Sequence, residues 1–296
     1  MPTPPKRPAQ DPVRYENVTE AAGVPVSSEG ASMIATRYEW AARLTPGCRV
    51  LEIGCGAGVG LGRLAAGARY TCGIDVSAAL LRSARAHYGG RVSLVRSSAD
   101  DLPFAAASFD VVVFFESTYY VADTERAFRE TARVLTPGGV ALFASANPER
   151  PDFVRSPHSV SYHSADQFRA ALEALGFRVT VEGAFPVEIG EAGLGHRLGG
   201  AALRLARRTL ERLRLVPRTL RGRAWLKRLV HGKLTPVPAE LLTGFAGEAA
   251  RHVVAAGPAR GFKVLYVTAK QRGAAGLNGH AAAGSNQRHS LTDEVE

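Results

Sequence analysis

Residues 49–58 read Arg-Val-Leu-Glu-Ile-Gly-Cys-Gly-Ala-Gly, and this stretch decides the fold class of the chain. The first five residues have the apolar, β-branched character of a buried strand, and glycines occupy every second position from residue 54 onward. Glycines directly after a strand let the backbone turn sharply and approach a ligand closely. Their GxGxG spacing differs from the GxGxxG of dinucleotide-binding loops, because Val59 or Leu61 stands where the last glycine would be.

Two carboxylates flank this glycine stretch. Glu52 lies at the end of the expected strand, where it would repel a pyrophosphate but suits a ligand that carries an ammonium and a sulfonium group. Asp75 ends the next expected strand, about twenty residues on, and is placed to accept hydrogen bonds from two ribose hydroxyls. The pair predicts a site for a positively charged nucleoside compound.

Short apolar runs alternate with amphipathic stretches of helical length over much of the chain, which predicts an α/β fold built from βαβ units. Ser77 is the expected N-cap of one helix, and Ser164 with Gln167 forms the capping box of another. A segment of about eighty residues separates the last two expected strands and is predicted to be an insertion. The expected strands are 49–53, 70–74, 92–95, 110–115, 140–144, 177–181 and 262–268.

Further motifs follow in order: Ser97-Ser-Ala-Asp-Asp-Leu-Pro-Phe104, Ser108-Phe-Asp110, Glu116-Ser117 and Arg133-Val-Leu-Thr-Pro-Gly-Gly139. With the glycine stretch, they resemble the class I S-adenosylmethionine-dependent methyltransferases that act on small molecules and sugars. The resemblance covers roughly residues 30–185. It implies a Rossmann-like, seven-stranded, mostly parallel sheet with helices on both faces, S-adenosylmethionine as the cofactor, and methyl transfer as the reaction.

The resemblance also assigns cofactor-binding residues. Ser98 departs from the family, which often has an acid there, although its hydroxyl can still meet the adenine amino group. The expected contacts are Glu52, Gly54, Cys55, Gly56 and Gly58 at the methionine moiety, Asp75 at the ribose, Val76, Ser98, Ala99 and Asp100 at the adenine, and Glu116 at the end of the fourth strand.

The acceptor is less closely defined. The chain lacks an Asn-Pro-Pro-Tyr-type element after the fourth expected strand, which argues against amide nitrogens of nucleic acid or protein and favours an O-methyl acceptor, with nitrogen and carbon left open. A looser resemblance over 146–164, to bacterial proteins associated with sugars and cell-surface polysaccharide, favours a small-molecule or glycan-type acceptor. His163 and His158 are the candidate bases for an alcohol acceptor, although either could be a surface or capping histidine.

The net charge of +10 is concentrated in one segment, because residues 197–233 contain twelve Lys or Arg and a single acid. Its leucines share one helical stripe, which predicts a basic helix. Such a helix can be a solvated face, bind an anionic acceptor such as a nucleotide sugar or lipid-linked glycan, or contact an acidic membrane surface peripherally. We rank nucleic acid lower as a partner, because Trp225 is the only aromatic residue placed among these basic residues, and single-stranded nucleic acid binding relies on aromatic stacking.

The ends and the cysteines complete the expected organisation. The N-terminus lacks the apolar run of a secretory signal, and three cysteines match neither a disulfide framework nor a metal-binding spacing, so we expect a cytoplasmic protein without a metal. An RNA methyltransferase and a catalytically silent cofactor-binding partner subunit are the alternative functions. The predicted parts are a disordered 1–14, a helical cap 15–45, a cofactor domain 46–185, a helical acceptor-site insertion 186–260, a last core strand 261–272 and a disordered tail 273–296.

Overall fold

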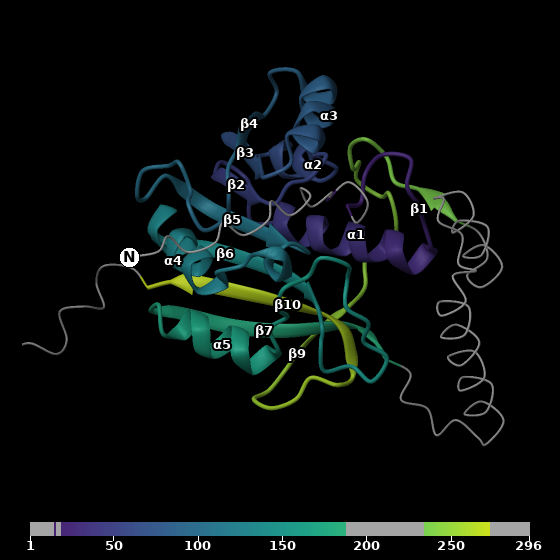
Figure 1. Cartoon of the computed structure of the whole chain (residues 1–296), viewed down its shortest axis with the longest axis vertical. Helices are drawn as coiled ribbons and strands as arrows, with labels where there is room; N and C mark the ends of the chain where they lie inside the picture. The colour runs from purple at the N-terminus through teal and green to yellow at the C-terminus, as the bar shows by residue number, and fades with distance from the viewer. Residues whose placement is uncertain (1–14, 16–18, 188–233, 273–296) are drawn as a thin grey trace, which may run out of the picture.

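The structure is a computed structural model that describes residue 15 and residues 19–187 and 234–272. Its centre is an eight-stranded mixed sheet in the order β4-β3-β2-β5-β6-β10-β7-β9 (Figure 1). The predicted disordered ends and the predicted basic helix lie outside the described residues. The strands of this sheet are β2 (Arg49–Ile53), β3 (Tyr70–Asp75), β4 (Ser93–Arg96), β5 (Phe109–Phe115), β6 (Leu135–Ala146), β7 (Phe177–Pro186), β9 (Arg251–Val253) and β10 (Phe262–Gln271).

The sheet has a parallel half and an antiparallel half. β4, β3, β2, β5 and β6 pair in parallel, whereas β10 runs antiparallel between β6 and β7. The seven predicted strands are confirmed, but the prediction of seven is incomplete, since the three-residue β9 pairs with Glu182–Ala184 as an eighth edge strand. Because the first four strands are parallel, their carboxyl ends meet at one edge of the sheet, where ligands bind in such folds.

Helices cover both faces of the sheet, as expected. α4 and α5 pack on one face, where Phe128 and Phe168 contact Phe143 of β6. α1 and α2 pack on the other face, which buries Trp40 against Tyr266 of β10. The predicted caps of α3 and α5 are both present. The helices are α1 (Ser28–Ala42), α2 (Leu61–Ala65), α3 (Ala78–Tyr88), α4 (Thr124–Val134) and α5 (Ala165–Glu173), with a 3₁₀ turn at Thr118–Tyr120.

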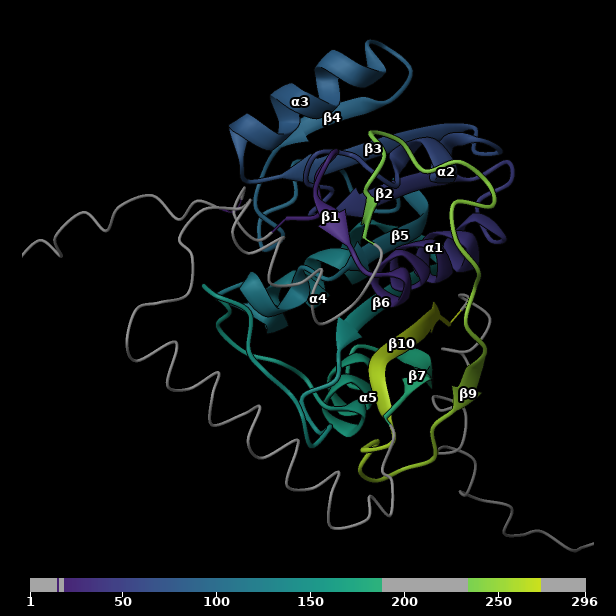
Figure 2. The ribbon, with the colours of Figure 1, turned by 90° about the vertical axis from the view of Figure 1, so that its right-hand side faces the viewer.

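The prediction of a helical insertion over the acceptor site is wrong for its described part, residues 234–260. That stretch holds the strands β8 (Thr235–Pro236) and β9 with connecting loops, and its prolines and glycines disfavour a helix. β8 pairs with β1 (Pro25–Val26) beside α1 (Figure 2). Val237 and Leu241 are buried in the cluster that contains α1, and the Leu241 amide donates to the Val59 carbonyl (2.8 Å). This stretch therefore packs against α1 and supports its position.

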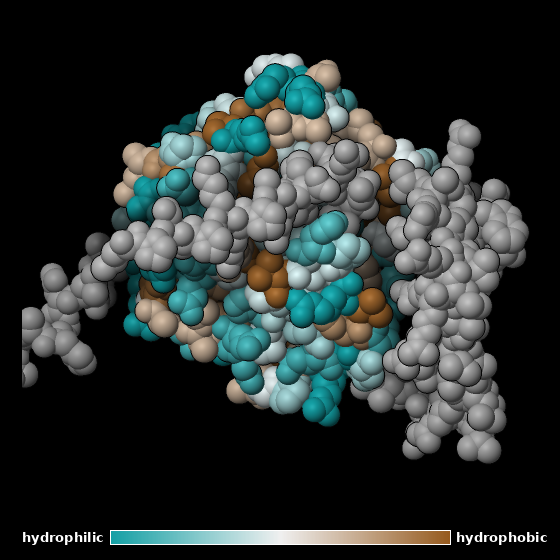
Figure 3. Space-filling view, viewed as in Figure 1, coloured by the Kyte–Doolittle hydropathy of each residue, from teal (hydrophilic) through white to brown (hydrophobic). Residues whose placement is uncertain are grey.

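The exposed large apolar side chains of the described residues come from several separate parts of the chain, and the face drawn in Figure 3 shows small apolar areas among hydrophilic ones. None of the described helices is long and apolar enough to cross a bilayer. The organisation that matters for function is therefore the edge where the parallel strands end.

Candidate functional site

A cavity of about 360 Å³ lies where β4, β3, β2 and β5 end. Two of the predicted cofactor residues, Glu52 and Gly58, do not line it. No residue of the described stretch 234–260 lines it either, so the expectation that the insertion covers the site is not met by those residues. The predicted residues that do line the cavity are Gly54, Cys55, Gly56, Asp75, Val76, Ser98, Ala99, Asp100 and Glu116.

The glycine stretch forms a bend that only glycine fits well at Gly54. This residue has φ +72°, and a Cβ atom there would lie 2.4 Å from the Ser117 Oγ. The amides of Gly54 and Cys55 both donate to the Ile74 carbonyl, at 2.8 and 2.9 Å. The bend is thus held between the ends of β3 and β5, with its backbone against the cavity.

Asp75 joins this bend to the next strand end. Its Oδ2 accepts from the Gly56 amide (2.9 Å) and its Oδ1 accepts from the Ser77 amide (2.8 Å). An ionised carboxylate has about four lone-pair sites, so the same group can also accept from hydroxyls of a ligand in the cavity. Val76 beside it is 43% exposed, an apolar surface on which a base can lie.

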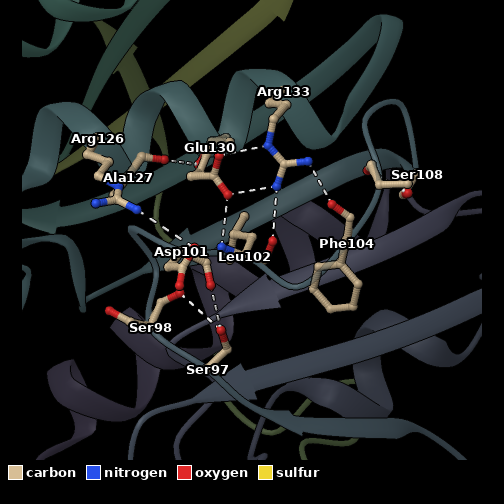
Figure 4. Close-up of polar contacts among 12 residues, drawn as sticks. Ser97, Ser98, Asp101, Leu102, Phe104, Ser108, Arg126, Ala127, Glu130 and Arg133 are labelled. Carbon is tan, nitrogen blue, oxygen red and sulfur yellow. Dashed lines mark hydrogen bonds and ion pairs between the residues drawn. The ribbon is translucent and has the colours of Figure 1, made fainter.

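The loop after β4 supplies the other end of the cavity and is held rigidly from α4 (Figure 4). The Arg133 guanidinium donates to the carbonyls of Leu102 (3.0 Å) and Phe104 (2.7 Å), and Glu130 accepts from the Leu102 amide (2.9 Å). The Ser98 hydroxyl donates to Asp100. The family-like turn around Arg133 therefore has a structural role, which is to fix the loop that presents Ser98 to the cavity.

Glu52 lies behind the bend, not in the cavity wall. It is 1% exposed, and its Oε1 accepts from the Tyr38 hydroxyl (2.6 Å), while its Oε2 has no partner among the described residues. Burial raises the pKa of Glu52 to about 7, with Tyr38 and Arg37 opposing that rise. Glu52 was predicted to contact the ligand directly, but its side chain does not line the cavity. It is linked to the cavity by Tyr38, which does line it.

The raised pKa of Glu52 predicts a stability that falls with pH. Because the folded-state pKa is about 7 and the unfolded value is near 4.5, the stabilisation is fully present below 4.5 and is lost as pH rises through 7. Glu52→Gln should therefore raise the free energy of unfolding by about 2 kcal/mol at about pH 8 and change it little at about pH 4.5. Urea unfolding at both pH values measures the effect.

Glu39→Gln is the matched control, because hydrogen bonds from Arg63 (2.6 and 2.8 Å) hold the pKa of Glu39 below its usual range. That variant should be less stable than the wild type at about pH 8. If Glu52→Gln lost stability in the same way, Glu52 would be an ionised and paired residue in the folded protein.

The side of the cavity next to β5 is formed by the predicted Glu116 and by Arg37, which the sequence did not single out. Arg37 of α1 is 6% exposed and forms an ion pair with Glu20, while its Nε atom has no partner among the described residues. Glu116 has φ +47°, which is unusual for a residue with a side chain, and its Oε2 accepts from the Tyr119 hydroxyl (2.9 Å). Burial raises the pKa of Glu116, and Arg37 opposes that rise.

One signal for these residues was present in the sequence. Arg37 shares a helical stripe with Ile34 and Ala41, so it is a charged residue on a face that must be buried. The segment 15–45 was predicted as a cap, but the position of Thr19 against the glycine bend had no signal of its own in the sequence. The lining residues that were missed include Tyr15, Thr19, Glu20, Arg37, Tyr38, Tyr119 and Tyr120.

Neither candidate histidine lines the cavity, so the expectation of a histidine base is not supported. His163 packs between the rings of Phe128 and Phe168, with centroid distances of 5.5 and 5.2 Å, and burial lowers its pKa. His158 is an exposed loop residue with φ +67°. Among the carboxylates that line the cavity, Glu116 is the one nearest in sequence to these two histidines.

Comparisons with known proteins show which family part of this chain resembles. A family model described as a methyltransferase domain matches residues 51–143. A probable S-adenosylmethionine-dependent methyltransferase of Mycolicibacterium smegmatis is 35% identical over 147 residues, which cover 48% of this chain and 56% of that protein. The O-methyltransferase resE of Aspergillus sclerotiorum is 34% identical over 173 residues, which cover 52% of this chain and 65% of that protein. The chain thus spans less than two thirds of either relative.

The fold has relatives among solved structures. The crystal structure of the YcgJ protein from Bacillus subtilis superposes with a TM-score of 0.51 at 18% identity, covering 80% of this chain and 98% of that one. The sheet order and the ligand-sized cavity at its edge are those of a Rossmann-like domain. Residues 51–143 match the methyltransferase-domain family, and the part of the chain around them is similar to S-adenosylmethionine-dependent methyltransferases.

Proposed function

We propose that this chain is an S-adenosylmethionine-dependent methyltransferase that methylates a hydroxyl oxygen of a small-molecule or sugar-type acceptor. The observation that carries this proposal is the cavity, whose wall passes from Ser98 through Asp75 and the glycine bend to Glu116. Its described wall contains four acids and one arginine, an excess of negative charge that favours a cationic ligand. The O-methyltransferase relative supports oxygen as the methyl acceptor.

The residues of the cavity fit this cofactor. When bound, S-adenosylmethionine supplies a methyl group that is electrophilic because it is attached to a positively charged sulfur. Asp75 can accept from the ribose hydroxyls, and Ser98 with Ala99 can meet the adenine. The bend at Gly54 leaves no room for a side chain. The buried Nε atom of Arg37, which has no partner among the described residues, can donate to a carboxylate of the ligand.

Glu116 takes the place that the histidines were expected to fill. It lies in the cavity wall beside the glycine bend, where a hydroxyl acceptor would approach, and its carboxylate can hold the proton that such an acceptor releases. Tyr15, Thr19 and Glu20 line the same cavity from the N-terminal side and can exclude water from it. An anionic acceptor and contact with an acidic membrane surface stay predictions, since the basic segment lies outside the described residues.

The test is a screen for methyl transfer by the full chain. The chain is incubated with S-adenosylmethionine and with separate pools of phenols, carboxylic acids, sugars and nucleotide sugars, and mass spectrometry detects a gain of one methyl group. We expect a gain in a pool of hydroxyl compounds that Asp75→Ala abolishes. A chain that binds the cofactor but methylates no pool would instead be the catalytically silent partner subunit.

A further inference from the structure

Glu116 occupies an unusual place in the cavity. It follows β5 directly, and the next residue, Ser117, packs against the glycine bend, with its hydroxyl donating to the Ile53 carbonyl (3.2 Å). The positive φ of Glu116 (+47°) turns the chain at this point. Non-glycine residues are held in this conformation at the expense of backbone strain, and such strain clusters at functional sites.

The order of the strands places Glu116 relative to the cofactor, and this step rests on the proposed function. The cavity wall follows the ends of β4, β3, β2 and β5 in that order. If Asp75 at the end of β3 holds the ribose, the adenine lies toward β4 and the sulfur-bearing arm extends past β2 toward β5. Glu116 follows β5 at that end of the row, and Glu20 lines the same cavity from the N-terminal segment.

The neighbouring charges act on Glu116 in both directions. Arg37, the basic residue of the described wall, forms an ion pair with Glu20 and also lowers the pKa of Glu116, whereas burial and the charge of Glu20 raise it. The Tyr119 hydroxyl donates to one oxygen of Glu116, which supports the ionised form without neutralising it. A cation that enters this end of the cavity therefore meets a carboxylate in a largely buried setting, where electrostatic attraction is strong.

We propose that the Glu116 carboxylate faces the sulfur of the bound cofactor and selects the positively charged sulfonium over the neutral thioether product. The carboxylate attracts the positive sulfur of S-adenosylmethionine, and the sulfur of S-adenosylhomocysteine carries no such charge, so Glu116 favours the substrate over the product. Tyr119 is a positioning residue, because its hydroxyl keeps the carboxylate turned toward the cavity. Glu116 thus favours product release after each transfer.

The experiment compares the dissociation constants of S-adenosylmethionine and S-adenosylhomocysteine by calorimetry with the full chain, at about pH 8, because burial raises the pKa of Glu116 and a higher pH favours its ionised form. We expect the wild type to prefer S-adenosylmethionine. Glu116→Gln should reduce that preference about tenfold by weakening S-adenosylmethionine binding alone. Unchanged binding of S-adenosylhomocysteine is the internal check that the variant folds.

Asp100→Asn is the matched control, because it removes a carboxylate from the far end of the same cavity wall. It should change both affinities by a similar factor and leave their ratio as in the wild type. Tyr119→Phe should lower the ratio about threefold, since the carboxylate keeps its charge but loses its hydrogen bond. If Glu116→Gln fails to bind either compound, Glu116→Asn, which tolerates a positive φ, is measured in its place.

The outcomes separate the inference from the function on which it rests. If the wild type binds neither compound, both the inference about Glu116 and the proposed function are overturned. If the wild type binds both but Glu116→Gln keeps the wild-type ratio, the sulfonium role of Glu116 is overturned while the cofactor site stands. A ratio that falls equally in Asp100→Asn would show a general effect of cavity charge and would also overturn the specific role of Glu116.

Discussion

The Asp75→Ala variant should bind S-adenosylhomocysteine about 100-fold more weakly than the wild type, because two charge-assisted hydrogen bonds to the ribose are lost. The same substitution removes the acceptor of the Gly56 amide, so the bend loses a support on its β3 side. Asp75→Asn keeps one acceptor oxygen and should lose only about tenfold. Calorimetric titration of each full-length variant with S-adenosylhomocysteine measures both effects.

The control for Asp75 is an acid of the same sheet that lies away from the cavity. Asp110 is near the other end of β5, where hydrogen bonds from Arg49 lower its pKa to about 2. Asp110→Asn should lower the stability of the fold but leave the affinity for S-adenosylhomocysteine unchanged. Equal affinity in wild type and Asp75→Ala would count directly against the proposed cofactor site.

Gly54→Ala should weaken S-adenosylhomocysteine binding about 100-fold, since a shift of about 1 Å in a positioned group can have an effect of that size. The added Cβ atom would lie 2.4 Å from the Ser117 Oγ, and the backbone at Gly54 has φ +72°. Either the bend or the end of β5 must move. Both the affinity and the urea midpoint report the change.

Gly138→Ala separates the steric effect from the backbone effect. Gly138 has φ +81°, close to that of Gly54, but no atom lies within 4 Å of the position that its Cβ would take. This variant should lose about 1 kcal/mol of stability and no affinity. Adding Ser117→Gly to Gly54→Ala should recover part of the binding. Normal binding by Gly54→Ala would mean that the bend does not support the cofactor.

Much of the sheet was predictable because its signals are local. The run Arg49–Ile53, the glycine bend and Asp75 belong to a single β-turn-α-β unit, and each residue there acts on neighbours within about one turn or one strand. The order of the strands followed from the handedness and parallel pairing of such units. The edge strand β9 was not predicted, because three residues are too few to show a periodic pattern of apolar side chains.

The errors have a common cause. His163 stands in a polar stretch of sequence and looked available, but tertiary packing places its ring between Phe128 and Phe168. Glu52 looked like a ligand contact, but the alternation of side chains along β2 turns it toward Tyr38 of α1. For both residues the prediction failed because the sequence does not show the direction in which the side chain points.

The sequence by itself determined the α/β fold, the glycine bend and the carboxylate after β3, since these depend on short-range backbone preferences and on the regular pairing of strands. Only the tertiary structure decided what closes the other side of the cavity. Glu20 precedes the first strand, Arg37 belongs to α1 and Glu116 follows β5, and they meet because α1 packs across the sheet. Contacts between residues far apart in the chain leave no periodic pattern, so burial and packing alone bring them together.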